Sequence, residues 1–374
     1  MATLSICMIV KNEEENLRKT LPAMAASADE LIIVDTGSTD GTVELARSFG
    51  AKVYSFPWIN DFSAARNESL KYATQEWILW LDADEYMKED DLKTLKHELD
   101  GRSEWLCYLP VCECLYGTTD EKSRYFRDKI FRNHLGIHFE RPINEQVVFP
   151  AGHTGKTAQL PSFPIYHWGR DLSEEKMARK NTERAVLFEK VLEVEGGDPH
   201  YHYLLGCRYL DLHNQERALK ELDEAIRTAV NDSDRYLKEG AHLRRGWIFF
   251  EKNDFVNALA EGLAARDLNP SNAESYCLAG GSCLALGRME EAVQIMEKSA
   301  ELIYREHPVL GTQIRYWNFL RYSFMANAYI ATQQYAKAMA PLAQALQAEP
   351  QNETLTRLFG MLNQMVNRTE TVRA

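Results

Sequence analysis

The feature that most constrains the fold is a pattern of small residues that repeats along the C-terminal half of the chain. Counted from residues 239 and 273, which lie 34 residues apart, small side chains occupy the same three positions of each copy. Copies counted from residues 199 and 319 follow the same pattern, so that the four sets are Gly206, Ala218, Ala225; Gly246, Ala258, Ala265; Gly280, Ala292, Ser299; and Ala326, Ala338, Ala345. Small residues at fixed positions let paired helices pack closely, so the pattern predicts a stack of helical pairs.

The period and the small positions are those of the tetratricopeptide repeat. We therefore expect a repeat domain over residues 199–374, in which residues 353–366 form a helix that covers the last apolar face. Before this domain, residues 173–195 predict one amphipathic helix, with Ser173 as its N-cap and Gly196-Gly197 at its end. The domain boundary is expected near Asp171, which gives a first domain over residues 1–170 and a linker helix over residues 171–198.

The N-terminal half follows a different pattern, in which apolar segments alternate with helical ones. Segments 4–10, 30–34, 51–56 and 77–81 have the character of buried strands, and segments 13–26, 42–49 and 62–73 have the character of helices. This alternation implies a mostly parallel sheet that is covered by helices on both faces. Ligands of such sheets bind beyond the carboxyl ends of the strands, so the polar residues after Val10, Val34 and Leu81 are expected at the binding edge.

Charge, apolar content and cysteine pattern exclude several classes of protein. A formal net charge of −12 repels phosphate backbones, so nucleic acid is not an expected partner. The apolar segments are shorter than the roughly 20 residues that span a bilayer, so no transmembrane segment is expected. Residues 1–10 lack a basic leader and a cleavage site, and we interpret them as a strand. Seven cysteines without a zinc-binding or paired pattern suit a reducing compartment, which predicts a cytoplasmic protein.

Two carboxylates, Asp82 and Asp84, directly follow the strand expected at residues 77–81. Hard cations such as Mg²⁺ and Mn²⁺ prefer carboxylate oxygens and can bridge them to a diphosphate. A metal ion in that position would neutralise the charge that develops on a departing diphosphate. The pattern Asp-x-Asp is also found at solvated strand ends, but after a buried strand of a parallel sheet it favours a metal site. His167, near the end of this domain, has an imidazole that can ligate a metal ion. The alternative is a purely structural role.

Two further residues are candidates for binding a nucleotide. Asp35 ends the second expected strand, where its carboxylate can accept hydrogen bonds from a base or a ribose. Arg66 lies near the start of the helix expected at residues 62–73, where it can reach a nucleotide phosphate or base. Asp40, by contrast, is interpreted as a structural cap of the next helix.

Transfer of a group to an acceptor needs a general base, and a carboxylate commonly serves as one. Glu140 and Glu145 are the candidates in the segment 136–147. Glu145 is the first choice because it follows a short apolar segment that ends at Ile143 and could hold it rigidly. The structural alternative is a surface salt bridge between Glu145 and Arg141.

In combination and in order, these motifs resemble the family-2 glycosyltransferases of the GT-A fold, specifically the bacterial subgroup that carries tetratricopeptide repeats. The matching segments are residues 5–14, 34–42, 61–67, 77–85, 131–133, 136–147 and 166–169, and with the repeats they cover nearly the whole chain. The resemblance implies an α/β GT-A domain with a Rossmann-like mixed sheet, followed by an all-α tetratricopeptide-repeat solenoid. The chain departs from the family at Asn144, where histidine is usual, but it retains Glu145.

The resemblance also implies an activity, that of an inverting hexosyltransferase-type enzyme that uses a nucleotide-diphosphate sugar and a divalent metal, Mn²⁺ or Mg²⁺. It implies a metal site at Asp82, Asp84 and His167, and Glu145 as the catalytic residue. The nucleotide-sugar site that we expect consists of Val10, Asn12, Glu13, Asp35, Arg66, Asp82 and Arg132. Some relatives with this layout glycosylate peptides or proteins, so the implied acceptor is a peptide, a protein or a glycan in contact with the repeats.

Two other functions fit parts of the sequence. A catalytically inactive scaffold could use its repeats to bind partner proteins, but the presence of both Asp82 and Asp84 argues against this reading. A nucleotidyltransferase also places carboxylates at a sheet edge, yet it would have a Gly-rich, basic phosphate loop after the first strand. Here Val10 is followed by Lys11 and Asn12 and then by three glutamates, which argues against a nucleotidyltransferase.

Overall fold

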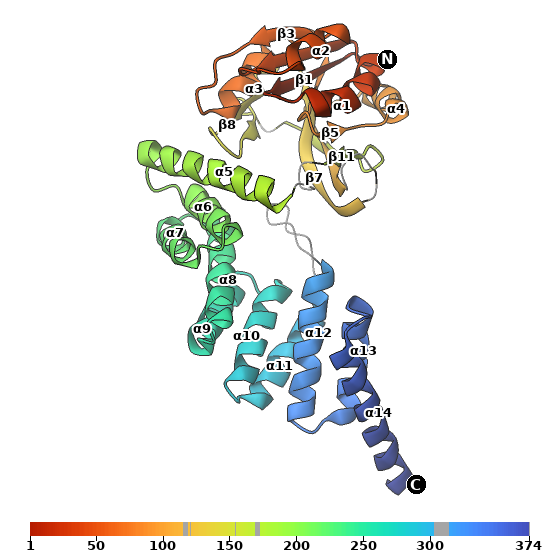
Figure 1. Ribbon diagram of the computed structural model, residues 1–374, viewed down its shortest axis with the longest axis vertical. Helices are drawn as coiled ribbons and strands as arrows, with labels where there is room; N and C mark the ends of the chain where they lie inside the picture. The colour runs from red at the N-terminus through yellow and green to blue at the C-terminus, as the bar shows by residue number, and fades with distance from the viewer. Residues whose placement is uncertain (115–118, 120, 154, 169–172, 303–313, 374) are drawn as a thin grey trace. The chain divides into compact units, whose positions relative to one another are not determined.

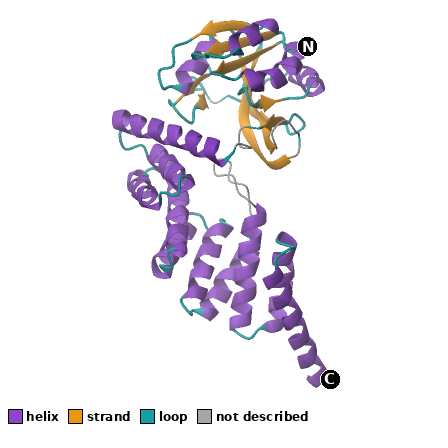
Figure 2. Ribbon diagram, in the orientation of Figure 1, coloured by secondary structure: helices purple, strands orange, loops and turns teal. Residues whose placement is uncertain are grey.

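The computed structural model describes residues 1–114, 119, 121–153, 155–168, 173–302 and 314–373. The chain divides into two compact units, Met1–Met177 and Ala178–Ala374. The first unit contains all the strands of the described residues, and the second is helical (Figures 1 and 2). The boundary residue expected from the sequence, Asp171, lies outside the described residues.

The first unit is built on a sheet with the strand order β3–β2–β1–β4–β7–β6–β11–β5, to which β10 adds by pairing with β6. The strands of this sheet are β1 (Leu4–Val10), β2 (Glu30–Asp35), β3 (Lys52–Ser55), β4 (Trp77–Trp80), β5 (Glu85–Tyr86), β6 (Leu106–Cys114), β7 (Glu121–Arg132), β10 (Thr157–Gln159) and β11 (Ile165–His167). A separate antiparallel pair consists of β8 (His138–Glu140) and β9 (Gln146–Val148). The four strands expected from the sequence are present, each with ends within one residue of the expected positions.

The sheet is mixed, as the family resemblance implied. Strands β3, β2, β1 and β4 run parallel to one another, as the alternating pattern predicted. Strand β7 is antiparallel to both β4 and β6, and β5 is antiparallel to β11. Four helices pack on this sheet: α1 (Glu14–Ser27), α2 (Thr42–Ser48), α3 (Phe62–Leu70) and α4 (Glu89–Leu99).

Each face of the sheet has its own apolar core. On one face, Leu17 and Leu95 of α1 and α4 pack with strand residues such as Leu79, and all three are fully buried. On the other face, Trp80 and Phe131 pack with the partly buried Leu70 of α3. Strand β4 therefore contributes to both cores, and this rigid support lies directly before the two carboxylates of the Asp-x-Asp motif.

The second unit is a series of antiparallel helical pairs. Its helices are α6 (Pro199–Asp211), α7 (Gln215–Thr228), α8 (Arg235–Glu251), α9 (Phe255–Leu268), α10 (Ala273–Ala285), α11 (Met289–Ala300), α12 (Ile314–Ala331), α13 (Tyr335–Ala348) and α14 (Glu353–Arg373). The long helix α5 (Glu174–Glu195) precedes them and contains the division between the two units. Each copy counted from the sequence contains one helical pair, and the α14 helix follows the last pair as expected. These elements confirm the predicted fold class, an α/β domain followed by an all-α repeat unit.

The small residues of the repeat lie where paired helices meet. Ala218, Ala258, Ala292 and Ala338 occupy the same position of the four copies, and all are 0% exposed. At the first small position, a Cβ atom added to Gly206 would lie 2.9 Å from Leu222 Cγ. The close packing of the helices is therefore the physical cause of the repeating pattern.

Gly246 of α8 gives a test of this packing. A Cβ atom there would lie 2.3 Å from Cδ2 of Leu278, which is fully buried in α10. Helix propensity alone favours alanine over glycine by about 1 kcal/mol. We expect Gly246→Ala nevertheless to lower the free energy of unfolding, by about 1–3 kcal/mol, because overpacking outweighs propensity. Urea denaturation monitored by circular dichroism measures the change.

Gly360 of α14 is the matched control, since nothing lies within 4 Å of a Cβ atom added to it. Gly360→Ala is expected to raise stability slightly, by about 0.5–1 kcal/mol. If the free energy of unfolding changed in the same direction in both variants, the packing explanation for Gly246 would be contradicted.

None of the helices in the described ranges combines the length and the apolar character that a membrane crossing requires.

Candidate active site

The polar residues that follow β1, β2 and β4 lie at one edge of the sheet. The parallel register pairs Val10 of β1 with Asp35 of β2, so both strands end at the same level. The backbone N–H of Leu81, directly after β4, donates to the carbonyl of Cys7 in β1. Asp82 therefore follows β4 at the same edge as Asp35, which is the arrangement that the sequence predicted.

Asp35 and Asn12 organise the two loops at this edge. The Asp35 carboxylate accepts from the backbone N–H groups of Gly37 and Ser38, at 3.2 and 3.1 Å. Gly37 has a φ of 109°, a conformation that only glycine adopts easily. The Asn12 side chain accepts from the N–H of Thr39 at 2.7 Å, and the Asn12 N–H donates to Ser38 Oγ at 2.8 Å. These bonds fix the shape of the edge on which we expected the nucleotide.

Two other residues expected in the nucleotide site, Val10 and Glu13, bond to neighbouring segments. The Val10 carbonyl accepts from the N–H and the hydroxyl of Thr36, at 2.9 and 3.0 Å, and Val10 is 3% exposed. The Glu13 N–H donates to Thr42 Oγ1 at 2.8 Å, and its carboxylate accepts from Asn16 at 2.7 Å. Both residues lie at the predicted edge, where they join the β1 loop to the β2 loop and to α2.

Arg66 of α3 links two of the predicted carboxylates, Asp82 and Glu145. Its Nη2 lies 2.6 Å from Asp82 Oδ1, and its Nε lies 2.7 Å from Glu145 Oε1. The guanidinium stacks on the ring of Trp80, 4.3 Å from the centroid, and only 6% of the Arg66 side chain is exposed. The structure thus brings together Arg66, Asp82 and Glu145, which are up to 79 residues apart in the sequence.

The charges of this cluster stabilise one another. Burial alone would lower the pKa of Arg66, but the carboxylates of Asp82 and Glu145 hold it above its usual range. Burial alone would raise the pKa of Asp82, but Arg66 and Lys129 hold it well below its usual range. Both groups are therefore charged at neutral pH, and the removal of either leaves the other with fewer partners of opposite charge.

The loop that carries Glu145 is fastened to the start of α3. Ser63 Oγ donates to the carbonyl of Arg141 at 2.6 Å, and the Phe62 N–H donates to the carbonyl of Pro142 at 2.7 Å. Arg141 has a φ of 78°, a left-handed conformation that is unfavourable for a long side chain and that these bonds hold in place. Glu145 therefore occupies a defined position beside Arg66 and has 14% of its side chain exposed.

Glu140, the alternative base, lies on the exposed side of β8. Its side chain is 59% exposed, and its Oε1 lies 3.1 Å from Nε2 of His138. The intervening Phe139 is buried and faces Trp80 and Arg66. Because successive side chains of a strand point to opposite faces, Glu140 points away from the Arg66 cluster.

Asp84 and His167 meet at the other side of the Asp-x-Asp motif. Nε2 of His167 lies 3.4 Å from Asp84 Oδ2, and Nδ1 lies 2.9 Å from Glu113 Oε2. Burial alone would lower the pKa of His167, but the bonds to Asp84 and Glu113 raise it to about 10. The Trp168 N–H also donates to the carbonyl of Asp84, which ties the loop after β4 to β11.

A divalent cation fits this donor set. Among the residues that the structure describes, no three His, Cys, Asp or Glu side chains form a ready metal site. Mg²⁺, however, is usually held by one or two carboxylates together with substrate phosphates. Two adjacent ligands of such an ion lie about 3 Å apart, which is close to the separation of Asp84 and His167. Asp82, whose Oδ1 already bonds Arg66, lies two residues away.

Lys129 and Glu85 belong to this site, although neither was expected from the sequence. Nζ of Lys129 lies 2.7 Å from Glu85 Oε2 and 3.5 Å from the centroid of the Trp80 ring. The same Glu85 oxygen accepts from the N–H of Asp82 at 2.9 Å. Lys129 is 2% exposed. In the sequence it stands directly before the apolar pair Ile130 and Phe131, and this was the one sign that its side chain could be buried.

Arg132, by contrast, does not reach the site for which it was predicted. The antiparallel register pairs it with Trp77, the first residue of β4, and its Nη1 lies 2.6 Å from Glu76 Oε1. Asp82 follows the opposite end of β4, about 16 Å away at about 3.3 Å per residue. The prediction for Arg132 is corrected on this ground, because a strand that runs antiparallel carries its last residue to the wrong edge.

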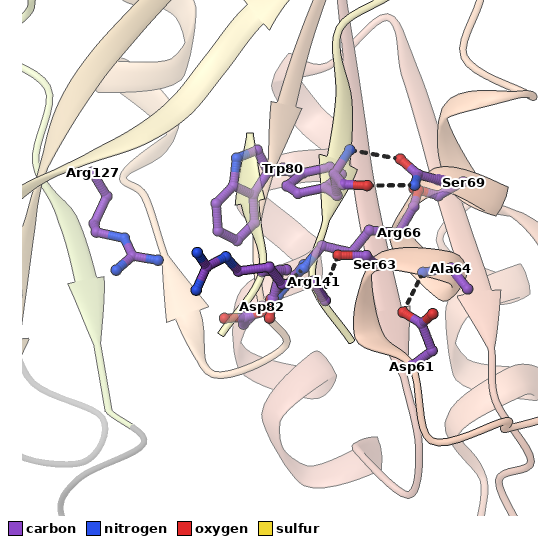
Figure 3. Close-up of polar contacts among 12 residues, drawn as sticks. Asp61, Ser63, Ala64, Arg66, Ser69, Trp80, Asp82, Arg127 and Arg141 are labelled. Atoms are coloured by element: carbon purple, nitrogen blue, oxygen red, sulfur yellow. Dashed lines mark hydrogen bonds and ion pairs between the residues drawn. The ribbon is translucent and has the colours of Figure 1, made fainter. Parts of the chain in front are cut away.

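Two other arginines face the predicted site. Figure 3 shows the guanidinium groups of Arg127 and Arg141 pointing toward each other beside Asp82. Arg127 belongs to β7, and Arg141 follows β8. With Arg66 they place three guanidinium groups near Asp82, and guanidinium groups suit the binding of an anion such as a phosphate.

Comparisons with known proteins agree with this architecture. Residues 5–151 match the family described as Glycosyl transferase family 2, and residues 273–304 match the tetratricopeptide repeat. A TPR repeat-containing protein of Synechococcus elongatus is 42% identical over 147 residues, which are 39% of this chain and 36% of that protein. The SPbeta prophage-derived glycosyltransferase SunS of Bacillus subtilis is 26% identical over 260 residues, which are 68% of this chain and 60% of SunS.

The crystal structure of S. aureus TarS 1-349 has a TM-score of 0.41 and 16% identity, and the match covers 72% of this chain and 92% of that one. The chain spans about a third of the first of the two curated relatives and three fifths of the second. The family match runs from β1 to the loop that carries Glu145 and ends before His167 of β11. Residues 5–151 therefore form a domain that matches glycosyl transferase family 2, and a unit that matches the tetratricopeptide repeat follows it.

Proposed function

We propose that the chain is a metal-dependent, inverting glycosyltransferase that moves a sugar from a nucleotide-diphosphate sugar to a peptide or protein acceptor. The observation that carries this proposal is the pairing of Asp84 with His167 beside the Arg66–Asp82 ion pair, at the carboxyl edge of a family-2 domain. A divalent cation, Mn²⁺ or Mg²⁺, would be held by Asp84 and His167, with Asp82 beside them. When bound, it would neutralise negative charge on the leaving diphosphate.

The chain's own residues divide the donor site into two parts. The loops fixed by Asp35 and Asn12 would receive the nucleoside, with Val10 and Glu13 supporting their shape. Arg66 and the facing pair Arg127 and Arg141 would contact the diphosphate through charge-assisted hydrogen bonds. Arg132 has no part in this proposal.

Glu145 is the proposed base. Its Oε1 accepts from Arg66, which orients the carboxylate so that Oε2 can take the proton of the acceptor. Arg66 thus links the group that would take the acceptor's proton to the side of the site that would hold the leaving diphosphate, because it contacts Glu145 and Asp82 at once. An acceptor that attacks from the face opposite the diphosphate would invert the anomeric carbon.

We propose that the acceptor binds to the repeats, because helical arrays of this kind present extended surfaces that suit peptides.

The proposed domain limits remain 1–170, 171–198 and 199–374. We propose a reducing compartment, the cytoplasm, because the seven cysteines form no zinc-binding or paired pattern in the sequence.

A thermal-shift screen tests the function on the full chain. Nucleotide-diphosphate sugars with different bases are added one at a time, with and without Mn²⁺. We expect one donor to raise the melting temperature, and to do so more strongly with Mn²⁺, because a ligand at 100 times its Kd adds about 2.7 kcal/mol to the folded state. The same donor should then release its nucleoside diphosphate in an assay with acceptor. A catalytically inactive scaffold would release no nucleoside diphosphate.

A further inference from the structure

Glu113 of β6 lies behind His167 at the proposed metal site. The parallel register pairs these two residues directly across β6 and β11. Glu113 Oε2 lies 2.9 Å from Nδ1 of His167, while the other ring nitrogen, Nε2, faces Asp84. The imidazole is therefore held between two carboxylates, one on each nitrogen.

The second oxygen of Glu113 has its own donor. The hydroxyl of Tyr125, on the neighbouring strand β7, donates to Glu113 Oε1 at 2.7 Å. Glu113 is 4% exposed, so its carboxylate is withdrawn from solvent as well as occupied on both oxygens. It is thus arranged to support His167 and not to serve as a metal ligand.

A buried carboxylate is unfavourable unless it is hydrogen-bonded or paired with a charge, so we expect Glu113 to have a specific role at this position. A histidine that binds a metal through one nitrogen almost always donates its other N–H to a carboxylate, a carbonyl or water. That bond fixes the orientation of the ring and raises the basicity of the ligating nitrogen. The alternative purpose is structural, a link between β6 and β11, and the two purposes predict different results.

We infer that Glu113, fixed by Tyr125, is a positioning residue that aims Nε2 of His167 at the divalent cation shared with Asp84. This inference rests on the proposed metal site. A positioning role predicts that the loss of Glu113 weakens metal binding, whereas a structural link predicts that it lowers stability alone.

The test measures the affinity of the full chain for Mn²⁺ alone, from the electron paramagnetic resonance signal of the free ion. We expect Glu113→Ala to bind Mn²⁺ about 10–100-fold more weakly than the wild type. Glu113→Gln keeps an oxygen that can accept from Nδ1, so most of the affinity should return. If Glu113→Ala does not fold, Glu113→Met fills a similar volume without an acceptor and carries the same expectation.

Glu30 supplies the matched control. Its side chain is 3% exposed, and it accepts from Ser5 Oγ and from the Thr74 N–H at 2.7 and 2.8 Å. It lies at the first residue of β2, so that Glu30→Ala removes an equally buried carboxylate at the opposite edge of the same sheet. Glu30→Ala is expected to bind Mn²⁺ as the wild type does.

The outcomes distinguish the positioning role of Glu113 from the proposed metal site on which it depends. Wild-type affinity in folded Glu113→Ala or Glu113→Met would overturn the positioning role and leave the metal site intact. Equal weakening by Glu30→Ala would also overturn it, because the effect would then be general. A wild-type chain that binds no Mn²⁺ would overturn both.

Discussion

Replacement of Asp84 by asparagine is expected to reduce sugar transfer by about 10²–10³-fold, because a charged ligand of the proposed cation is lost. A metal ion contributes several kcal/mol to the stabilisation of developing charge, and each 1.36 kcal/mol corresponds to a factor of ten. The fold should survive, since the bond from the Trp168 N–H to the backbone carbonyl of Asp84 does not depend on the side chain that is replaced. Initial rates at several Mn²⁺ concentrations, for an identified donor and acceptor, measure the effect.

Asp82→Asn is the comparison that shows which effects are specific to Asp84. Asp82 differs from Asp84 because it bonds the buried guanidinium of Arg66. Its replacement should lower both activity and stability, since Arg66 would keep one carboxylate partner in place of two. Asp84→Asn should lower activity and Mn²⁺ affinity with little change in melting temperature. Normal rates and a normal response to Mn²⁺ in Asp84→Asn would remove Asp84 from the metal site.

Much of this site could be predicted because its parts are local in the sequence. Asp82 and Asp84 follow a short apolar strand, and Asp35 ends another, so the rule that ligands bind at the carboxyl ends of parallel strands brought them to one edge. The repeat positions could be predicted for a similar reason, because a small residue at a helical interface has a fixed place in each copy.

The rest depends on contacts that pair distant segments. Lys129 joins Glu85 across 44 residues, and Glu113 joins His167 across 54. Both contacts depend on the positions of β7 and β6 in the sheet, and the alternation of strands and helices in the first 81 residues does not determine where later strands insert. Arg132 was misplaced for the same reason, since the antiparallel direction of β7 carries its end to the opposite edge.

Asn144 departs from the family pattern at a position whose backbone suits both asparagine and the usual histidine. It has a φ of 57°, in the left-handed region where both residues are several-fold enriched. The position therefore requires a residue that tolerates this backbone, and asparagine meets the requirement. The neighbouring carboxylate of Glu145 can keep its place beside Arg66 whether or not histidine precedes it.

Glu145→Gln is expected to reduce turnover by about 10²–10⁴-fold while the affinity for the donor survives, because general-base catalysis has this magnitude. Glutamine keeps the shape of the side chain, and its amide oxygen can still accept from Arg66 Nε. Arg66 therefore stays in position for the diphosphate, and the proton-accepting group alone is removed. Donor affinity from the thermal shift and kcat from initial rates measure the two expectations separately.

Glu140→Gln is the control that decides between the two candidate bases. Glu140 lies in the same segment but is 59% exposed and pairs with His138, so its replacement should leave kcat within about twofold of the wild type, the range of a minor surface change. The opposite result, normal turnover in Glu145→Gln and a loss in Glu140→Gln, would move the base to Glu140 and require β8 to turn during catalysis. Normal turnover in both variants would mean that neither carboxylate takes the proton. The acceptor would then be a group that is already ionised, such as a cysteine thiolate, which attacks without a base.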